Sequence, residues 1–247
     1  MQEVKNILKQ IKWWEIAYLL ILFVAQIVLA VIFDASALVF FNSFFFILAI
    51  FFNAKGIFLG SVFGIVNTSL YLTMSYFNQY YGEMICSIVI TLPSWLISLY
   101  TWFKNRNKAT SIVKITPKIS AKEWILLFVV AGVLSVGVYF LLREWNTANL
   151  VVSTISTVIG GMAGYLQIRR SEYNFLFYIL VNIVCIVLWM SVVIKGDMSQ
   201  ILTIFVYVVI TCLNIFGTIN WFRLKKFQNE QNSDSMSKIM KIVKEKF

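Results

Sequence analysis

The sequence predicts an all-α integral membrane protein with eight transmembrane helices. Sixty per cent of its 247 residues are hydrophobic and only 13% are charged, a balance that is far from that of a water-soluble domain. The hydrophobic residues form eight runs between short polar segments, and each run is long enough to cross the hydrocarbon core of a bilayer. Lys and Arg gather on alternate segments, which is the third observation that favours this fold.

The eight hydrophobic runs cover residues 15–33, 37–53, 56–77, 83–103, 123–142, 148–168, 174–194 and 199–222. Trp and Tyr flank them, as at Trp13 before the first run and at Tyr80 and Tyr81 before the fourth, which is typical of membrane interfaces. The first run follows a basic segment, but its apolar core is longer than that of a signal peptide, so we expect it to remain as a helix. We expect Pro93 to bend the fourth helix or to free one of its carbonyl groups.

The charge distribution predicts which side each loop occupies. Nineteen Lys and Arg residues lie in the N-terminal segment, in the loops after the second, fourth and sixth runs, and in the C-terminal tail, whereas only Arg143 and Lys195 lie on the other side. Basic loops remain in the cytoplasm, so we expect a multi-pass protein of a bacterial plasma or inner membrane with both termini cytoplasmic. The tail end SKIMKIVKEKF fits either an amphipathic helix on anionic lipid or a solvated segment.

An internal repeat divides the chain into five parts. Residues 54–74 align with 169–189, and residues 94–104 align with 213–223, so that Asn67 matches Asn182 and Trp102 matches Trp221. Two parallel three-helix repeats follow, as in transporters that hold a substrate between such halves; chance similarity of apolar helices is the alternative. The predicted parts are an N-terminal tail with an extra helix (1–36), the first repeat (37–103), a basic loop with a linker helix (104–147), the second repeat (148–222) and a basic tail (223–247).

Several kinds of chemistry are disfavoured by the composition. The chain has no His, which removes the commonest general base and most catalytic zinc sites, and it has no phosphate-binding loop, so we expect no enzyme, no metal and no cofactor. Cys86, Cys185 and Cys212 lie within apolar runs and are expected to be small buried residues. The basic residues lie in loops and tails, which indicates membrane topology rather than binding to nucleic acid.

No Asp or Glu lies near the middle of a hydrophobic run. A carboxylate at that depth is the usual partner of a coupling proton or sodium ion. We therefore expect facilitated diffusion of a small molecule, with a sodium site built from carbonyl and hydroxyl oxygens as the alternative.

Amide and aromatic side chains mark the candidate binding site. Asn67 and Asn182 lie inside hydrophobic runs, where an amide needs a partner or a cavity. Helical periodicity places them on faces with aromatic residues that suit a flat ligand with polar edges; bonding between helices is the alternative. The predicted substrate-binding residues are Asn182, Tyr178, Phe175, Trp189, Asn67, Tyr71 and Asn214. The glycine ridges at Gly56, Gly60 and Gly64 and at Gly160 and Gly164 predict close helix packing.

Two stretches resemble the PnuC-type vitamin transporter family. They are GSVFGIVNTSLYLTM…YYGEMICSIVITLPSWLISLYTW in the first half and RRSEYNFLFYILVNIVCIVLW…IFGTINWF in the second, within residues 40–225. The resemblance implies a 3+1+3 helix core similar to that of SWEET sugar transporters, an extra N-terminal helix, a homotrimer, and passive import of nicotinamide riboside for NAD biosynthesis. It also implies that a cytoplasmic kinase traps the vitamin by phosphorylation.

The sequence departs from the family pattern at the expected site. Family members for nicotinamide riboside show a WxxW pair before the asparagine, whereas Phe175 and Tyr178 precede Asn182 here, and Trp95 replaces a glutamine expected near Pro93. A related member for thiamine, riboflavin or a deoxynucleoside is therefore an alternative. A membrane scaffold that docks a cytoplasmic partner is the alternative from another class.

Overall fold

The computed structural model consists of helices and two isolated β-bridges in the residues that it describes. These are residues 7, 10–77, 84, 86–108, 110–116, 118–147, 149–196 and 198–246, with side chains described as far as residue 231. The predicted interface residues Tyr80 and Tyr81 lie outside the described residues.

Each predicted hydrophobic run overlaps one α-helix, and the fourth and eighth also overlap a short π-helix and a short 3-10 helix. The elements in chain order are α2 (Trp13–Ile32), α3 (Ala37–Ala54), α4 (Leu59–Phe77), the π-helix η1 (Ser87–Thr91), α6 (Leu92–Lys104), α7 (Ala121–Glu144), α8 (Leu150–Ile168), α9 (Asn174–Ile194), the 3-10 helix η2 (Met198–Gln200) and α10 (Ile201–Lys246).

Six helices in the described part of the chain are long and apolar enough to cross a membrane, namely α2, α3, α7, α8, α9 and α10. The other two predicted helices, α4 and α6, do not meet these two conditions of length and composition in the described residues. The helix α4 carries polar residues such as Asn67 and Thr68, which it buries inside the protein. The helix α6 is only 13 residues long and continues from η1, with Pro93 in its first turn.

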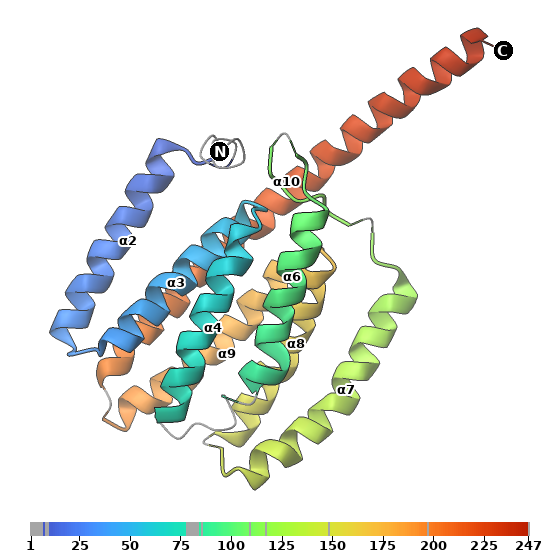
Figure 1. The fold of residues 1–247 in the computed structure, drawn as a ribbon. Helices are drawn as coiled ribbons and strands as arrows, with labels where there is room; N and C mark the ends of the chain where they lie inside the picture. The colour runs from blue at the N-terminus through green and yellow to red at the C-terminus, as the bar shows by residue number, and fades with distance from the viewer. Residues whose placement is uncertain are drawn as a thin grey trace.

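A closed ring of α3, α4, α6, α8, α9 and α10 forms the centre of the molecule. Each of these helices packs against the next around the ring, in the order α4, α3, α10, α9, α8, α6 and back to α4. In Figure 1, α3, α6, α8 and α10 run in one direction and α4 and α9 in the other. The sets α3–α4–α6 and α8–α9–α10 therefore have the same sequence of directions, and they meet where α3 contacts α10 and α6 contacts α8.

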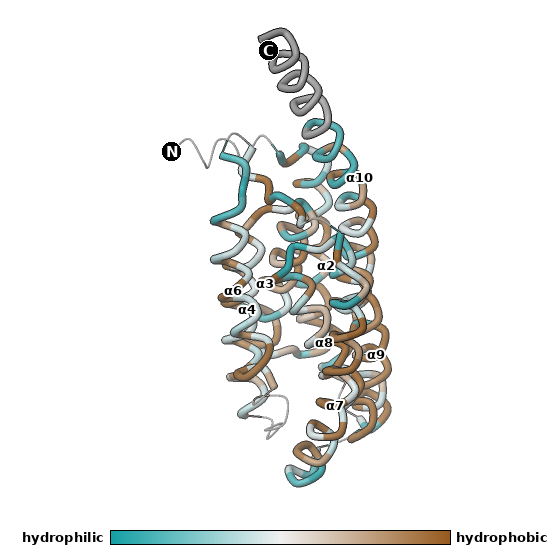
Figure 2. Tube along the Cα trace, turned by 90° about the vertical axis from the view of Figure 1, so that its right-hand side faces the viewer, coloured by the Kyte–Doolittle hydropathy of each residue, from teal (hydrophilic) through white to brown (hydrophobic). Residues whose placement is uncertain are grey.

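The helices α2 and α7 lie outside this ring. The helix α7 packs on α8, and α2 packs on α3 and α10. Most of their apolar side chains are exposed, such as Val133 and Phe128 on α7 and Ile21 on α2. Figure 2 shows hydrophobic residues along the middle of the bundle and hydrophilic residues toward its ends. Apolar side chains on the outer surface of a bundle are what a lipid environment stabilises.

The start of α2 and the C-terminal end of α10 lie at the same end of the bundle (Figure 1). The helix α10 has 46 residues, so the boundary expected at residue 223 is not a break in the helix. The loop after α6 packs on this end of the bundle: the Val113 amide donates to the Gly56 carbonyl at 2.9 Å, and Gln228 of α10 bonds main-chain groups of Val113 and Ile115. Pro117 of the same loop lies outside the described residues.

The glycines of the two ridges have different roles. A Cβ at Gly60 would lie 2.1 Å from Asn53 Oδ1, a Cβ at Gly64 would lie 2.4 Å from the Trp95 ring, and a Cβ at Gly164 would lie 2.8 Å from Ser94 Oγ. These three positions allow helices to approach closely. Gly160 has no atom within 4 Å of such a Cβ, and it faces the central cavity instead.

Candidate functional site

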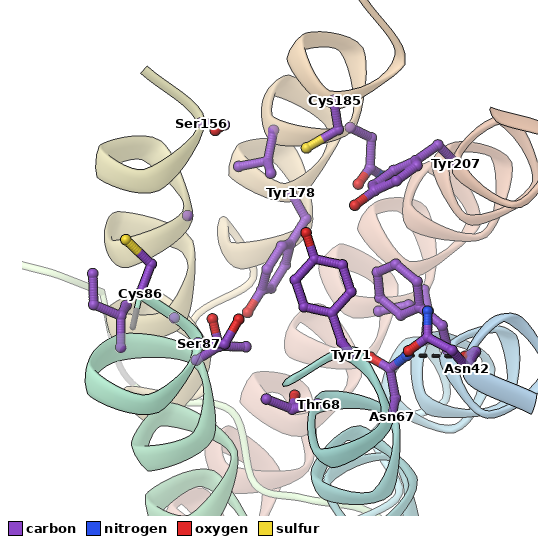
Figure 3. A pocket seen from close by; sticks show the side chains of 18 of the residues that line it. Asn42, Asn67, Thr68, Tyr71, Cys86, Ser87, Ser156, Tyr178, Cys185 and Tyr207 are labelled. Carbon is purple, nitrogen blue, oxygen red and sulfur yellow. Dashed lines mark hydrogen bonds between the residues drawn. The ribbon is translucent and has the colours of Figure 1, made fainter. Parts of the chain in front are cut away.

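A cavity of about 190 Å³ lies inside the helix ring. Every helix of the ring contributes to its lining, together with η1. The lining combines amide, hydroxyl and thiol groups with aromatic rings, and no Asp, Glu, Lys or Arg is among its described residues (Figure 3). A cavity with aromatic faces and a few polar groups is typical of small-molecule sites.

Four of the predicted binding residues line this cavity: Asn67, Tyr71, Tyr178 and Asn182. They come from α4 and α9, which lie on opposite sides of the ring. In Figure 3 the side chains of Tyr71 and Tyr178 point toward one another between these helices. The structure thus brings an asparagine and a tyrosine from each of these two helices to one cavity.

The Asn67 amide is held by a residue that the sequence analysis did not select. Its Nδ2 donates to Asn42 Oδ1 at 2.8 Å and to the Asn42 main-chain oxygen at 2.9 Å. Asn42 lies on α3 and also lines the cavity. An isolated asparagine within the run FFNSFFF was a usable signal, because an amide in an apolar helix needs a partner.

The corresponding amide on α9 has no partner for its nitrogen. Asn182 is 3% exposed, and its Nδ2 has no hydrogen-bond partner in the described part of the chain. An unsatisfied buried donor costs about 1–3 kcal/mol. A ligand with an acceptor group would recover part of this free energy.

Tyr178 is fixed by a second residue absent from the sequence-based selection. Its hydroxyl donates to Gln167 Oε1 at 2.9 Å, and Gln167 lies at the C-terminal end of α8 with 1% exposure. This bond holds the Tyr178 ring in the cavity wall. Only the position of Gln167 near a basic loop was visible in the sequence, and that position did not indicate a role in the site.

Two tryptophans outside the cavity lining join the two sets of ring helices. Trp102 of α6 and Trp221 of α10 are fully buried, with ring centroids 5.2 Å apart. Trp102 Nε1 donates to the Gln167 carbonyl at 2.9 Å, and Trp221 Nε1 donates to the Asn53 carbonyl at 3.0 Å. One bond joins α6 to α8 and the other joins α10 to α3, so the pair, which we call the tryptophan brace, ties the set α3–α4–α6 to the set α8–α9–α10.

Three predicted binding residues lie outside the cavity lining. Phe175 is 1% exposed and contacts Trp221, with ring centroids 5.3 Å apart. Trp189 packs in a hydrophobic cluster with Met74 and Leu202. Asn214 is 1% exposed, and neither polar atom of its side chain has a hydrogen-bond partner within the described residues.

The cysteines require a correction. Cys212 is exposed rather than buried, and Cys86 and Cys185 are partly exposed in the cavity lining. Both cavity cysteines lie on helix faces with polar neighbours, in contact with the space that a ligand would occupy (Figure 3). Trp95 also lines the cavity. Its ring lies so close to Gly64 that a side chain at this position would overlap it.

Comparison with known proteins places these features in a family context. The family model described as nicotinamide mononucleotide transporter matches residues 36–223. The chain is 29% identical over 193 residues to a protein of Neisseria mucosa named nicotinamide riboside transporter PnuC, covering 75% of this chain and 72% of the relative. It is 25% identical over 220 residues to a protein of the same name from Haemophilus influenzae, covering 88% and 93%.

A solved structure has a similar fold. The crystal structure of the vitamin B3 transporter PnuC superimposes with a TM-score of 0.76 and 26% sequence identity, covering 87% of this chain and 93% of the other.

Proposed function

The chain belongs to the nicotinamide mononucleotide transporter family of multi-pass membrane proteins, and from this premise we propose that it imports nicotinamide riboside or a closely similar pyridine nucleoside. The single observation that carries the choice of ligand is the cavity lining, which combines aromatic rings and amides without a described charged residue. The relatives named nicotinamide riboside transporters support the same choice.

The uncharged lining favours a nucleoside over its phosphate ester. A phosphate group would enter a low-dielectric cavity without Lys or Arg to balance its charge, which is unfavourable by several kcal/mol. A pyridinium ring, in contrast, is attracted to aromatic faces such as those of Tyr71, Trp95 and Tyr178. The amides of Asn67 and Asn182 are the groups that would bond its polar edge.

Transport by alternating access is the mechanism that we propose. The two repeats would form a 3+1+3 arrangement in which α7 links α3–α4–α6 to α8–α9–α10, with α2 as an extra helix. In this proposal the tryptophan brace would close the cavity toward the end where α2 begins and α10 leaves the bundle. Rocking of one repeat against the other would release both cross-repeat bonds together and open the cavity at that end.

The closed end is proposed to face the cytoplasm, because the basic loops and tail lie there. The described helices carry no Asp or Glu in the cavity lining, so the proposed transport is facilitated diffusion. A cytoplasmic kinase would then trap the ligand as a phosphate ester. A homotrimer is proposed from family resemblance alone.

The test is uptake by purified protein in sealed proteoliposomes. We expect uptake of labelled nicotinamide riboside that reaches the same final level with and without a sodium or proton gradient, at zero membrane potential. Nicotinamide mononucleotide should compete at least about tenfold more weakly, since its phosphate has no counter-charge in the cavity. Accumulation that requires an ion gradient would contradict facilitated diffusion. If the protein transports thiamine, riboflavin or a deoxynucleoside but not nicotinamide riboside, that compound is its ligand instead. A protein that binds and transports none of these compounds would support the alternative of a membrane scaffold.

A further inference from the structure

The Asn42–Asn67 contact fixes which end of the Asn67 amide faces the cavity. A main-chain carbonyl can only accept, so the nitrogen of Asn67 has to face the Asn42 main-chain oxygen, 2.9 Å away. Its second N–H is taken by Asn42 Oδ1 at 2.8 Å. Both donors of the amide are thus used inside the protein, and Figure 3 shows this contact at the wall of the cavity.

The remaining group of the amide is an acceptor. Asn67 Oδ1 accepts no hydrogen bond from the residues that the structure describes, while Asn67 itself lines the cavity. An oxygen in this state attracts N–H and O–H groups and repels an anion. Because no Lys or Arg is found among the described lining residues, a carboxylate next to Asn67 would have no counter-charge there.

We propose that Asn42 is a positioning residue that, through Asn67, makes the cavity select a carboxamide over a carboxylate on the pyridine ring. The inference rests on the proposed function and deepens it, because it states which form of the nucleoside is accepted. The carboxamide N–H donates to Asn67 Oδ1. The acid form places an oxygen against that oxygen and is rejected.

The substitution that tests this role is Asn42→Leu, which keeps the branched shape of the side chain and removes its oxygen. One N–H of Asn67 is then released while the bond to the Asn42 main-chain oxygen remains, so Asn67 offers a donor to the ligand beside its acceptor oxygen. The full-length protein in detergent is titrated by calorimetry with nicotinamide riboside and with the same riboside carrying a carboxylate in place of the carboxamide. Wild-type protein should prefer the amide by at least about tenfold, and Asn42→Leu should reduce this ratio to about threefold or less.

Two further variants separate positioning from a general structural effect. In an Asn67→Ala background, Asn42→Leu should leave the amide-to-acid ratio unchanged, because Asn42 acts only through Asn67. The matched control is Asn105→Leu, which removes a side-chain bond to the Thr101 carbonyl at the end of α6, away from the cavity. This control should keep the wild-type ratio.

The outcomes distinguish this inference from the proposed function. Wild-type protein that binds neither riboside overturns the proposed function and this inference with it. Wild-type protein that binds both ribosides equally overturns the inference alone, and this result does not depend on whether any variant folds. A folded Asn42→Leu protein with the wild-type ratio, or an Asn105→Leu protein with the same loss of selectivity, also overturns it.

Discussion

Replacing Trp102 by phenylalanine should weaken the closure of the cavity at its braced end. The substitution removes the indole N–H that donates to the Gln167 carbonyl at 2.9 Å and keeps an aromatic ring in the buried site. The Gln167 carbonyl still accepts from the Arg170 amide at 2.9 Å, so it is not left unsatisfied. The loss is therefore that of one hydrogen bond, about 1 kcal/mol, rather than the full desolvation cost of an orphaned carbonyl.

A loss of about 1 kcal/mol corresponds to about a fivefold shift toward the state that is open at the braced end. Cys86 and Cys185 report this shift, because both line the cavity. In a Cys212→Ser background, a membrane-impermeant thiol reagent applied to inverted vesicles should label these cysteines about fivefold faster in Trp102→Phe than in the parent. Bound nicotinamide riboside should slow the labelling.

The matched control is Trp124→Phe, since Trp124 on α7 stacks on Phe128 and Phe177 outside the brace. Its labelling rate should equal that of the parent. Equal rates in a folded Trp102→Phe protein would refute the brace as the closure, and so would the same acceleration in both variants. Trp221→Phe should match Trp102→Phe, because its bond to the Asn53 carbonyl is equivalent.

Three other substitutions test packing, ligand binding and charge. Gly64→Ala should lower the free energy of unfolding by about 1–3 kcal/mol in detergent, because its Cβ would overlap an indole ring at 2.4 Å, whereas Gly132→Ala meets nothing within 4 Å and should be tolerated. Asn182→Ala should weaken nicotinamide riboside binding by about 1–3 kcal/mol in calorimetry, and unchanged affinity would assign this amide to helix packing. Glu15→Gln should lower the free energy of unfolding by about 3 kcal/mol, because it leaves the largely covered Lys55 ammonium without its carboxylate partner; an unchanged free energy of unfolding would argue against this ion pair.

The order and the approximate positions of the helices were predictable, because a hydrophobic run of sufficient length has few other solutions in a membrane protein. The helix α9 was expected at residues 174–194 and spans Asn174–Ile194. Hydropathy failed at α4, where Asn67 and Thr68 are buried inside the ring and lower the apolar average. A helix that lines a polar cavity cannot also be uniformly apolar.

The angular positions of the side chains around α9 were predictable, but their heights along the helix relative to the cavity were not. Helical periodicity placed Phe175, Tyr178, Asn182 and Trp189 on one face of α9, yet Phe175 and Trp189 are separated by about 21 Å along the helix axis. Only Tyr178 and Asn182 reach the cavity. Phe175 packs in one cluster with the tryptophan brace, and Trp189 packs in a separate cluster. Periodicity gives the angle of a side chain around a helix, whereas its height relative to a cavity depends on tertiary packing.

Partners of the site residues were the hardest to predict. Asn42 lies on α3 and Tyr207 lies on the neighbouring helix α10, and both line the cavity. Gln167 lies at the end of α8, where its main-chain carbonyl accepts a hydrogen bond from Trp102 and its side-chain oxygen accepts one from Tyr178. These contacts join residues far apart in the sequence, so no local pattern indicates them.

The neutral lining of the cavity has an electrical consequence. A pyridinium nucleoside carries one positive charge, and a wall without described charged residues would let that charge cross the membrane uncompensated. One elementary charge gains about 2.3 kcal/mol per 100 mV, which corresponds to about a fiftyfold concentration ratio. A cell with a negative interior would therefore concentrate the vitamin through this protein by its voltage alone, and a neutral analogue would only equalise across the same membrane.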